Sequence, residues 1–166
     1  MIHNTHVSQY IPPTLFHTTT ATITQVAGDV AGTIAINRAA ANQTSLITIP
    51  IMVPSNSVAL QGAKLVSVEV DYENKTAEAD SLTFTLRKVT RGANLAVAVV
   101  ADITTTDAVL AADSHTVDQI KQVVTVTTPA WIDNDEYYLL EISLVAGAGG
   151  ATNKFLGAVA NFTLRM

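Results

Sequence analysis

Residues 64–89 read KLVSVEVDYENKTAEADSLTFTLRKV, and this stretch decides the fold class. Apolar and polar side chains alternate over residues 65–72 and again over residues 81–87. A period of two is typical of half-buried β-strands, because successive side chains point to opposite faces of a sheet. The first run predicts a core face made of Val66, Val68, Val70 and Tyr72. The polar segment 73–80 indicates a turn, so we expect the two strands to form an antiparallel pair.

The same alternation recurs along most of the chain. Further runs cover residues 22–26, 32–36, 45–53, 95–100, 115–127, 137–145 and 155–166. In the last run, Leu156, Ala158, Ala160 and Phe162 are expected to share the core face. About eight strands separated by turns every 8–12 residues or so predict an all-β, antiparallel β-sandwich. We expect a jelly-roll-like topology, with an immunoglobulin-like sandwich as the alternative.

The N-terminal segment does not follow this pattern. Residues 1–20 show neither a strand period nor a helix period, and Pro12 and Pro13 have no N–H to donate to a β-ladder. Two interpretations stay open: a disordered or locally packed terminus, and an extended arm lying along a neighbouring subunit. We therefore divide the chain into an arm (1–20) and a single β-sandwich domain (21–166). The candidate contact residues of the arm are Ile11, Pro12, Pro13, Leu15 and Phe16.

Composition limits the possible partners. The net charge is −5, charged residues make up 14% of the chain, and the Lys and Arg residues are scattered. This distribution argues against nucleic acid as a partner, since no basic stripe would follow a phosphate backbone. The sequence has neither a signal-peptide pattern nor an apolar run of membrane-spanning length, so no membrane partner is expected. The low charge fraction is typical of a surface covered by other subunits, or of a surface rich in Thr, Ser and Asn.

No motif for catalysis or for cofactor binding stands out. The chain contains no cysteine, no G-x-S-x-G elbow and no glycine-rich phosphate motif. Glu69, Asp71 and Glu73 share a strand face, which is more typical of a solvated face than of an acid–base pair. Residues 133–136 (DNDE) lack the Gly and the distal Glu of a calcium loop, so they indicate a hairpin turn. We expect no enzymatic activity and no cofactor.

The histidines do not predict a metal site within one chain. They are His3, His6, His17 and His115, and none has supporting ligands at metal-like spacing. A metal on a three-fold axis, held by one histidine from each subunit, stays open as a minor alternative.

Two aromatic residues are candidates for binding a sugar. Trp131 and Tyr137 flank the polar turn and would stack on a glycan if both were exposed near polar groups. The alternative is that Trp131 anchors the end of the sandwich, which we favour because large aromatic side chains usually belong to cores.

The order of strands and turns resembles a known group of proteins. The segments are ITIPIMVPSNSVALQGAKLVSVEVDYEN (47–74), SLTFTLRKV (81–89), IDNDEYYLLEISL (132–144) and the final FTLRM (162–166). Over residues 46–166, the chain resembles the small jelly-roll modules found on tailed-bacteriophage virions.

This resemblance implies a virion structural protein on the capsid surface. The expected role is that of a capsid decoration, or cement, protein, a homotrimer that stabilises contacts between subunits of the major capsid protein. Two alternatives stay open. One is a host-recognition module of a tail fibre or baseplate, which would bind glycan through Trp131 and Tyr137. The other is a carbohydrate-binding domain of a larger cellular enzyme.

Overall fold

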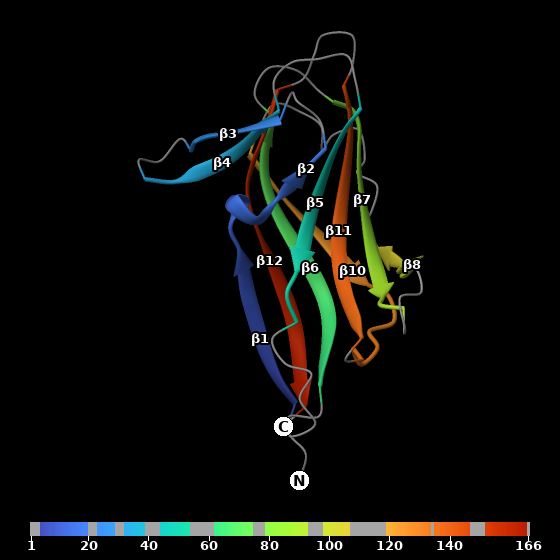
Figure 1. Cartoon of the computed structure of the whole chain (residues 1–166). Helices are drawn as coiled ribbons and strands as arrows, with labels where there is room; N and C mark the ends of the chain where they lie inside the picture. The colour runs from blue at the N-terminus through green and yellow to red at the C-terminus, as the bar shows by residue number, and fades with distance from the viewer. Residues whose placement is uncertain are drawn as a thin grey trace.

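The chain folds into two antiparallel β-sheets (Figure 1). The computed structural model describes residues 4–19, 23–28, 32–38, 44–53, 62–74, 79–92, 98–106, 119–133, 135–146 and 152–165. Within these ranges there are twelve strands and no α-helix, and the single short helix is the 3-10 turn η1 (Pro13–Leu15). The predicted all-β, jelly-roll-like sandwich is therefore confirmed, with more strands than the sequence suggested.

The two sheets differ in size. The seven-stranded sheet has the order β3-β4-β12-β6-β10-β9, with β1 also paired to β12, and the five-stranded sheet has the order β2-β5-β11-β7-β8. The strands of the first sheet are β1 (Asn4–Ile11), β3 (Ile23–Ala27), β4 (Ile34–Arg38), β6 (Ala63–Asn74), β9 (Thr105–Thr106), β10 (Gln119–Val126) and β12 (Asn153–Arg165). Those of the second are β2 (His17–Thr18), β5 (Ser45–Ile51), β7 (Ala79–Thr90), β8 (Val99–Asp102) and β11 (Glu136–Ala146).

The strands β6 and β7 do not pair with each other, so the predicted antiparallel pair is wrong. β6 lies between β12 and β10, whereas β7 lies between β11 and β8 in the other sheet. The two strands instead face each other across the core, where the ring centroids of Tyr72 and Phe84 are 6.2 Å apart. Alternation shows that a strand has one buried face, but it does not say whether the next strand lies beside it or opposite it.

Two bulges change which side chains reach the core. Val66 and Leu156 were expected on the core face, but both are half-buried, and Leu65 and Phe155 are buried in their place. The pairing of β6 with β12 shifts register at both positions, so Val66 and Leu156 are each left without a partner. A bulge inserts one residue and turns the preceding side chains to the opposite face.

The core between the sheets is apolar and continuous. Tyr138, Leu140, Ile142 and Leu144 of β11 are buried as the alternation predicted. Burying an aliphatic or aromatic side chain of this size stabilises the fold by about 1.5–3 kcal/mol. The facing residues of the seven-stranded sheet include Val68, Val70, Tyr72, Phe155, Ala158, Ala160 and Phe162.

The N-terminal segment differs from the expected arm. β1 pairs with β12 along its whole length, from Asn4 opposite Arg165 to Ile11 opposite Ala158, and the two strands run side by side in Figure 1. The physical reason is the edge of β12, because β4 covers only Asn153–Phe155 on that side. The remaining backbone groups of that edge find their hydrogen-bond partners in β1. Residues 4–18 thus belong to the sandwich.

The candidate contact residues of the arm are mostly buried within their own chain. Ile11 (2% exposed), Pro13 and Phe16 are buried, and Ile11 and Phe16 belong to the core cluster. Leu15 is 46% exposed and Pro12 is half-buried. Burial corrects the expectation that Ile11, Pro13 and Phe16 contact another protein.

Candidate functional site

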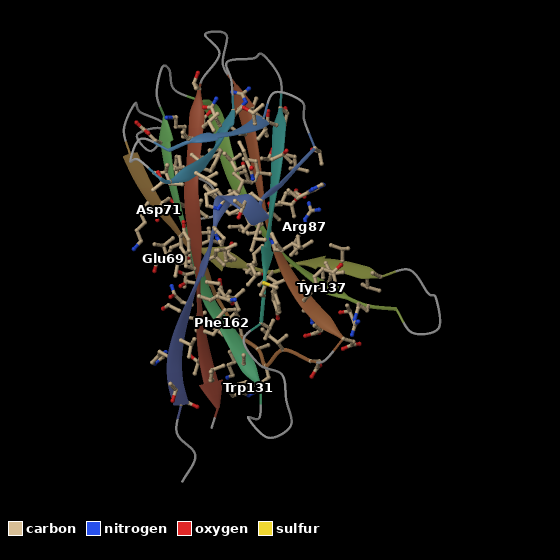
Figure 2. The ribbon with its side chains drawn as sticks, turned by 60° about the vertical axis from the view of Figure 1, so that its left-hand side comes forward. Glu69, Asp71, Arg87, Trp131, Tyr137 and Phe162 are labelled. Atoms are coloured by element: carbon tan, nitrogen blue, oxygen red, sulfur yellow. The ribbon has the colours of Figure 1, made fainter. Side chains whose placement is uncertain are left out.

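The structure does not bring Trp131 and Tyr137 together. Trp131 follows β10 and its backbone bridges to Lys64 of β6, at one end of the seven-stranded sheet. Tyr137 is 41% exposed on β11, and it points away from the core because its neighbour Tyr138 points inward. Figure 2 shows the two labelled side chains on different parts of the molecule. Trp131 is half-buried and lies outside the core cluster, so it does not anchor the core as we expected.

A polar network lies instead on the outer face of the seven-stranded sheet. Ser8 Oγ of β1 donates a hydrogen bond of 2.6 Å to Asn161 Oδ1 of β12. Asn161 Nδ2 donates to Ser67 Oγ at 3.1 Å and to Glu69 Oε1 at 2.9 Å, both on β6. One amide therefore ties three neighbouring strands together and fixes the direction of its own side chain.

Glu69 is held in its ionised form by this network. Its carboxylate also forms an ion pair with Lys121 of β10. The hydrogen bond from Lys121 lowers the pKa of Glu69 most, partial burial raises it, and the hydrogen bond from Asn161 lowers it further. The net result is a pKa below the ordinary value. A glycosidase acid needs a raised pKa, so Glu69 is suited to accepting hydrogen bonds and not to proton donation.

Tyr10 is exposed but held in place. The residue is 59% exposed near the end of β1, and its hydroxyl donates a hydrogen bond of 3.2 Å to the carbonyl oxygen of Leu156. The edge of the ring lies against Gly157, whose φ is +152° and where an added Cβ would come within 2.7 Å of the ring atom Cε2. The bulge at Leu156 and the absence of a side chain at Gly157 thus leave room for the Tyr10 ring to pack against β12.

Tyr10 borders a hollow of about 310 Å³, which we call the Tyr10 hollow. Its walls combine the aromatic ring with apolar side chains, backbone and two threonines. The lining residues are Tyr10, Pro12, Pro13, Thr14, Gly32, Thr33, Ile34 and Leu156.

A second hollow, of about 280 Å³, lies beside Trp131 and is called the Trp131 hollow. Lys64 Nζ lies 4.5 Å from the centroid of the Trp131 ring, a cation–π contact that orients the indole. The lining residues are Asn4, Lys64, Val66, Pro129, Trp131 and Thr163.

Sequence reasoning found only one of the two aromatic residues at these hollows. Trp131 was singled out, whereas Tyr10, Ser8 and Asn161 were not. Ser8 and Asn161 are 153 residues apart in the chain, so no local pattern joins them. The available signal was a weak one: Val7 and Ile11 alternate with polar residues across the segment that forms β1.

The remaining candidates form no further site in the described part of the chain. No group of three or more potential metal-ligating side chains occurs there, and His3 and His115 lie outside the described residues. The predicted turn before β11 is closed by hydrogen bonds from Glu136 N to Asp133 O (3.1 Å) and from Asp133 N to Glu136 Oε2 (3.2 Å). Among the described residues, no helix has the length and apolar character needed to cross a membrane.

Comparisons with known proteins give only distant likenesses. No protein-family model and no curated protein matches the chain. The structure is similar to the enzymatically active domain of tailspike protein 4 of bacteriophage CBA120, with a TM-score of 0.44 and 9% identity. That match covers 94% of this chain and 19% of the tailspike chain, so this chain spans about a fifth of the tailspike's length.

Two carbohydrate-binding modules show a comparable likeness. For a family 29 module carrying the E78R mutation, the TM-score is 0.45 and the identity 11%, with 95% of this chain and 92% of that chain covered. For the family 11 module from Clostridium thermocellum, in complex with a β-1,3-1,4-mixed-linked tetrasaccharide, the TM-score is 0.37 and the identity 9%. That match covers 98% of this chain and 87% of the module. At these TM-scores the likenesses carry no argument about function.

Proposed function

We propose that this protein is a non-catalytic glycan-binding module that holds a sugar against Tyr10. The observation that carries the proposal is an aromatic residue that is 59% exposed while its ring is held by the hydrogen bond of its hydroxyl and by contact with Gly157. An exposed ring with so few ways to move loses little conformational entropy when a ligand packs on it.

The surroundings of Tyr10 match the two sides of a sugar ring. A pyranose has an apolar face of C–H groups, which packs on an aromatic ring, and an edge of hydroxyl groups that need hydrogen-bond partners. The hollow supplies the apolar walls, and the neighbouring polar network supplies acceptors at Glu69 and Ser8. Binding sites of this kind combine an apolar surface with a small number of placed polar groups.

Host recognition at a phage tail fibre or baseplate is the biological setting that we propose for this binding. Capsid decoration stays an untested prediction. Of the residues expected to carry it, Leu15 and Pro12 are the ones that remain accessible, since Ile11, Pro13 and Phe16 are buried. The homotrimer and the major capsid protein as partner are part of that prediction.

The proposal is tested by electrophoresis of the protein through gels that contain soluble glucan, xylan, mannan, galactan or bacterial capsular polysaccharide. We expect one of these polymers to retard the wild type. Tyr10→Ala should then weaken the retardation about tenfold or more, which corresponds to about 1.4 kcal/mol.

Tyr137→Ala is the matched control, because Tyr137 is also exposed but lies on the other sheet. It should bind like the wild type. Equal binding by Tyr10→Ala and the wild type would contradict the proposed site, and the absence of retardation in every gel would contradict the proposed function.

A further inference from the structure

We propose that the two hollows are the ends of one continuous site, which takes a linear oligosaccharide chain running from β1 across β12 and β6 on the outer face of the sheet. Tyr10 would hold one end of this chain and Trp131 the other. The inference rests on the proposed function and extends it from a single sugar position to a chain of defined minimum length.

The spacing of the hollows follows from the strand that joins them. Asn4 lines the Trp131 hollow and Tyr10 lines the Tyr10 hollow, and both lie on β1. Because they are an even number of residues apart, their side chains point to the same face of the sheet. Trp131 itself lies level with His6, because it bridges to Lys64, Lys64 pairs with Thr163, and Thr163 pairs with His6. Four residues along the strands and three strand spacings of about 4.8 Å across them separate Trp131 from Tyr10 by roughly 20 Å. One sugar cannot touch both rings, so the site requires an extended chain.

The surface between the hollows carries polar side chains of β1, β6 and β12. Thr163 lines the Trp131 hollow, and its Oγ1 lies 3.5 Å from Nδ1 of His6 on β1. Ser8 and Asn161, joined by their hydrogen bond, form the next step along the same face. These hydroxyl, amide and imidazole groups both donate and accept hydrogen bonds. They can therefore satisfy the hydroxyl groups of the sugars between the two ends.

Both end residues are held before the ligand arrives. Tyr10 is fixed by the carbonyl of Leu156, and Trp131 is fixed by Lys64 and by the hydrogen bond from Ile132 N to Ala63 O (3.0 Å). All of these contacts belong to one sheet, so the distance between the rings is set by the β-ladder. A rigid pair of rings favours a ligand whose length matches their spacing.

Chain length should therefore control affinity. A short oligosaccharide can occupy one hollow at a time, whereas a chain long enough to reach from the Tyr10 hollow to the Trp131 hollow occupies both. Binding at the second hollow then becomes intramolecular and raises the apparent affinity by about 10²–10⁴-fold without any new type of contact.

The experiment uses linear oligosaccharides of increasing length, prepared from the polysaccharide that retards the wild type in the gels. Affinity is measured by isothermal titration calorimetry, and tryptophan fluorescence is recorded in parallel. The chain has one Trp, so the fluorescence reports Trp131 alone. Three variants are compared with the wild type: Tyr10→Ala, Trp131→Ala and Tyr137→Ala.

We expect a steep gain in affinity, of about a hundredfold or more, once the oligosaccharide is long enough to span both hollows. Trp131→Ala should remove this gain, so that long chains bind the variant no more tightly than short ones. Tyr10→Ala should weaken short and long chains, and Tyr137→Ala should weaken neither. Long chains should change the fluorescence of wild-type Trp131. This last measurement needs no variant, so it decides the matter even where Trp131→Ala fails to fold.

The two-ended site would be overturned by long chains that bind the wild type without changing the fluorescence of Trp131, or that bind a folded Trp131→Ala as tightly as the wild type. The glycan-binding function at Tyr10 would survive that result. A wild type that binds no polysaccharide overturns both proposals, so the two failures are distinguishable.

Discussion

Gly157 is the residue on which the position of Tyr10 depends. Its φ of +152° lies in the region that residues with a side chain rarely adopt, and a Cβ there would lie 2.7 Å from both Cε2 and Oη of Tyr10. Both the backbone angle and the contact thus require glycine at this place in β12.

Gly157→Ala should therefore destabilise the fold by about 1–3 kcal/mol, since backbone strain and the displaced ring act together. Urea denaturation measures this loss. In a Tyr10→Ala background the same substitution should cost less, because the ring no longer obstructs the new methyl group. Equal costs in the two backgrounds would mean that the ring does not rest against Gly157 in solution.

Glu69, on the outer face of the seven-stranded sheet, makes the stability of the fold depend on pH. Its pKa is lowered in the folded state, first of all by the hydrogen bond from Lys121. A lowered folded-state pKa contributes stability above the ordinary value of 4.5, and this stability is lost as pH falls through the folded-state pKa. Thermal unfolding of Glu69→Gln should accordingly depend less on pH below about 4.5 than that of the wild type. The effect should be small, because surface ion pairs contribute about 0–1 kcal/mol.

If the unfolding temperature changed equally with pH in Glu69→Gln and in the wild type below about pH 4.5, the pairing of Glu69 with Lys121 would be contradicted. A second acidic residue on the same face, Asp71, provides the control, since it lies opposite Lys121 and its charge acts on Lys121, whereas the hydrogen bond from Lys121 that lowers a carboxyl pKa goes to Glu69. In Asp71→Asn, the unfolding temperature should still fall with decreasing pH below about 4.5, because the Glu69–Lys121 pair is intact.

At the scale of elements, the burial of side chains in and after β1 distinguishes a strand of the sandwich from an arm that binds another subunit. Ile11 is 2% exposed at the end of β1, whereas Leu15, four residues later, is 46% exposed. In the sandwich, the first side chain fills the core and the second lies at the surface. In an arm that binds another subunit, both side chains would instead be exposed on the isolated chain and buried against the partner.

Ile11→Ala should lower the free energy of unfolding by about 2–5 kcal/mol, because it leaves a cavity in the core. Leu15→Ala should change it by no more than about 0.5 kcal/mol. Denaturant titration of the isolated protein measures both. A neutral Ile11→Ala would show that β1 does not pack on the core in solution and would restore the arm interpretation.

At the scale of the whole molecule, one chain supplies every residue of the proposed site. The hollows and the surface between them come from β1, η1, β4, β6 and β12 and from the segments next to η1, β4 and β10. We therefore expect oligosaccharide affinity per chain to be the same at low and high protein concentration, as measured by titration at two concentrations beside light scattering. An affinity that rises with a concentration-dependent mass would show that the site needs a second subunit. The light-scattering mass also tests the predicted homotrimer.

Local alternation made the strands predictable because a side-chain period of two is a property of a few consecutive residues. It predicted the runs that became β5, β6, β7, β11 and β12, and with them the all-β sandwich. It was least effective at β1, where polar residues fill the outer positions and a pair of prolines follows. Trp131 was singled out by residue type alone, and the same reasoning selected Tyr137, which lies on the other sheet.

The sequence by itself determined that this chain forms half-buried strands, roughly where they run, and that it contains few charges. Only the tertiary structure decided that β6 and β7 face each other across the core, and that bulges at Val66 and Leu156 change which side chains are buried. It also decided that Tyr10 and Ser8 meet β12 near the other end of the chain. The physical reason is that strand pairing and register are set by hydrogen bonds and packing between distant segments, which no local period encodes.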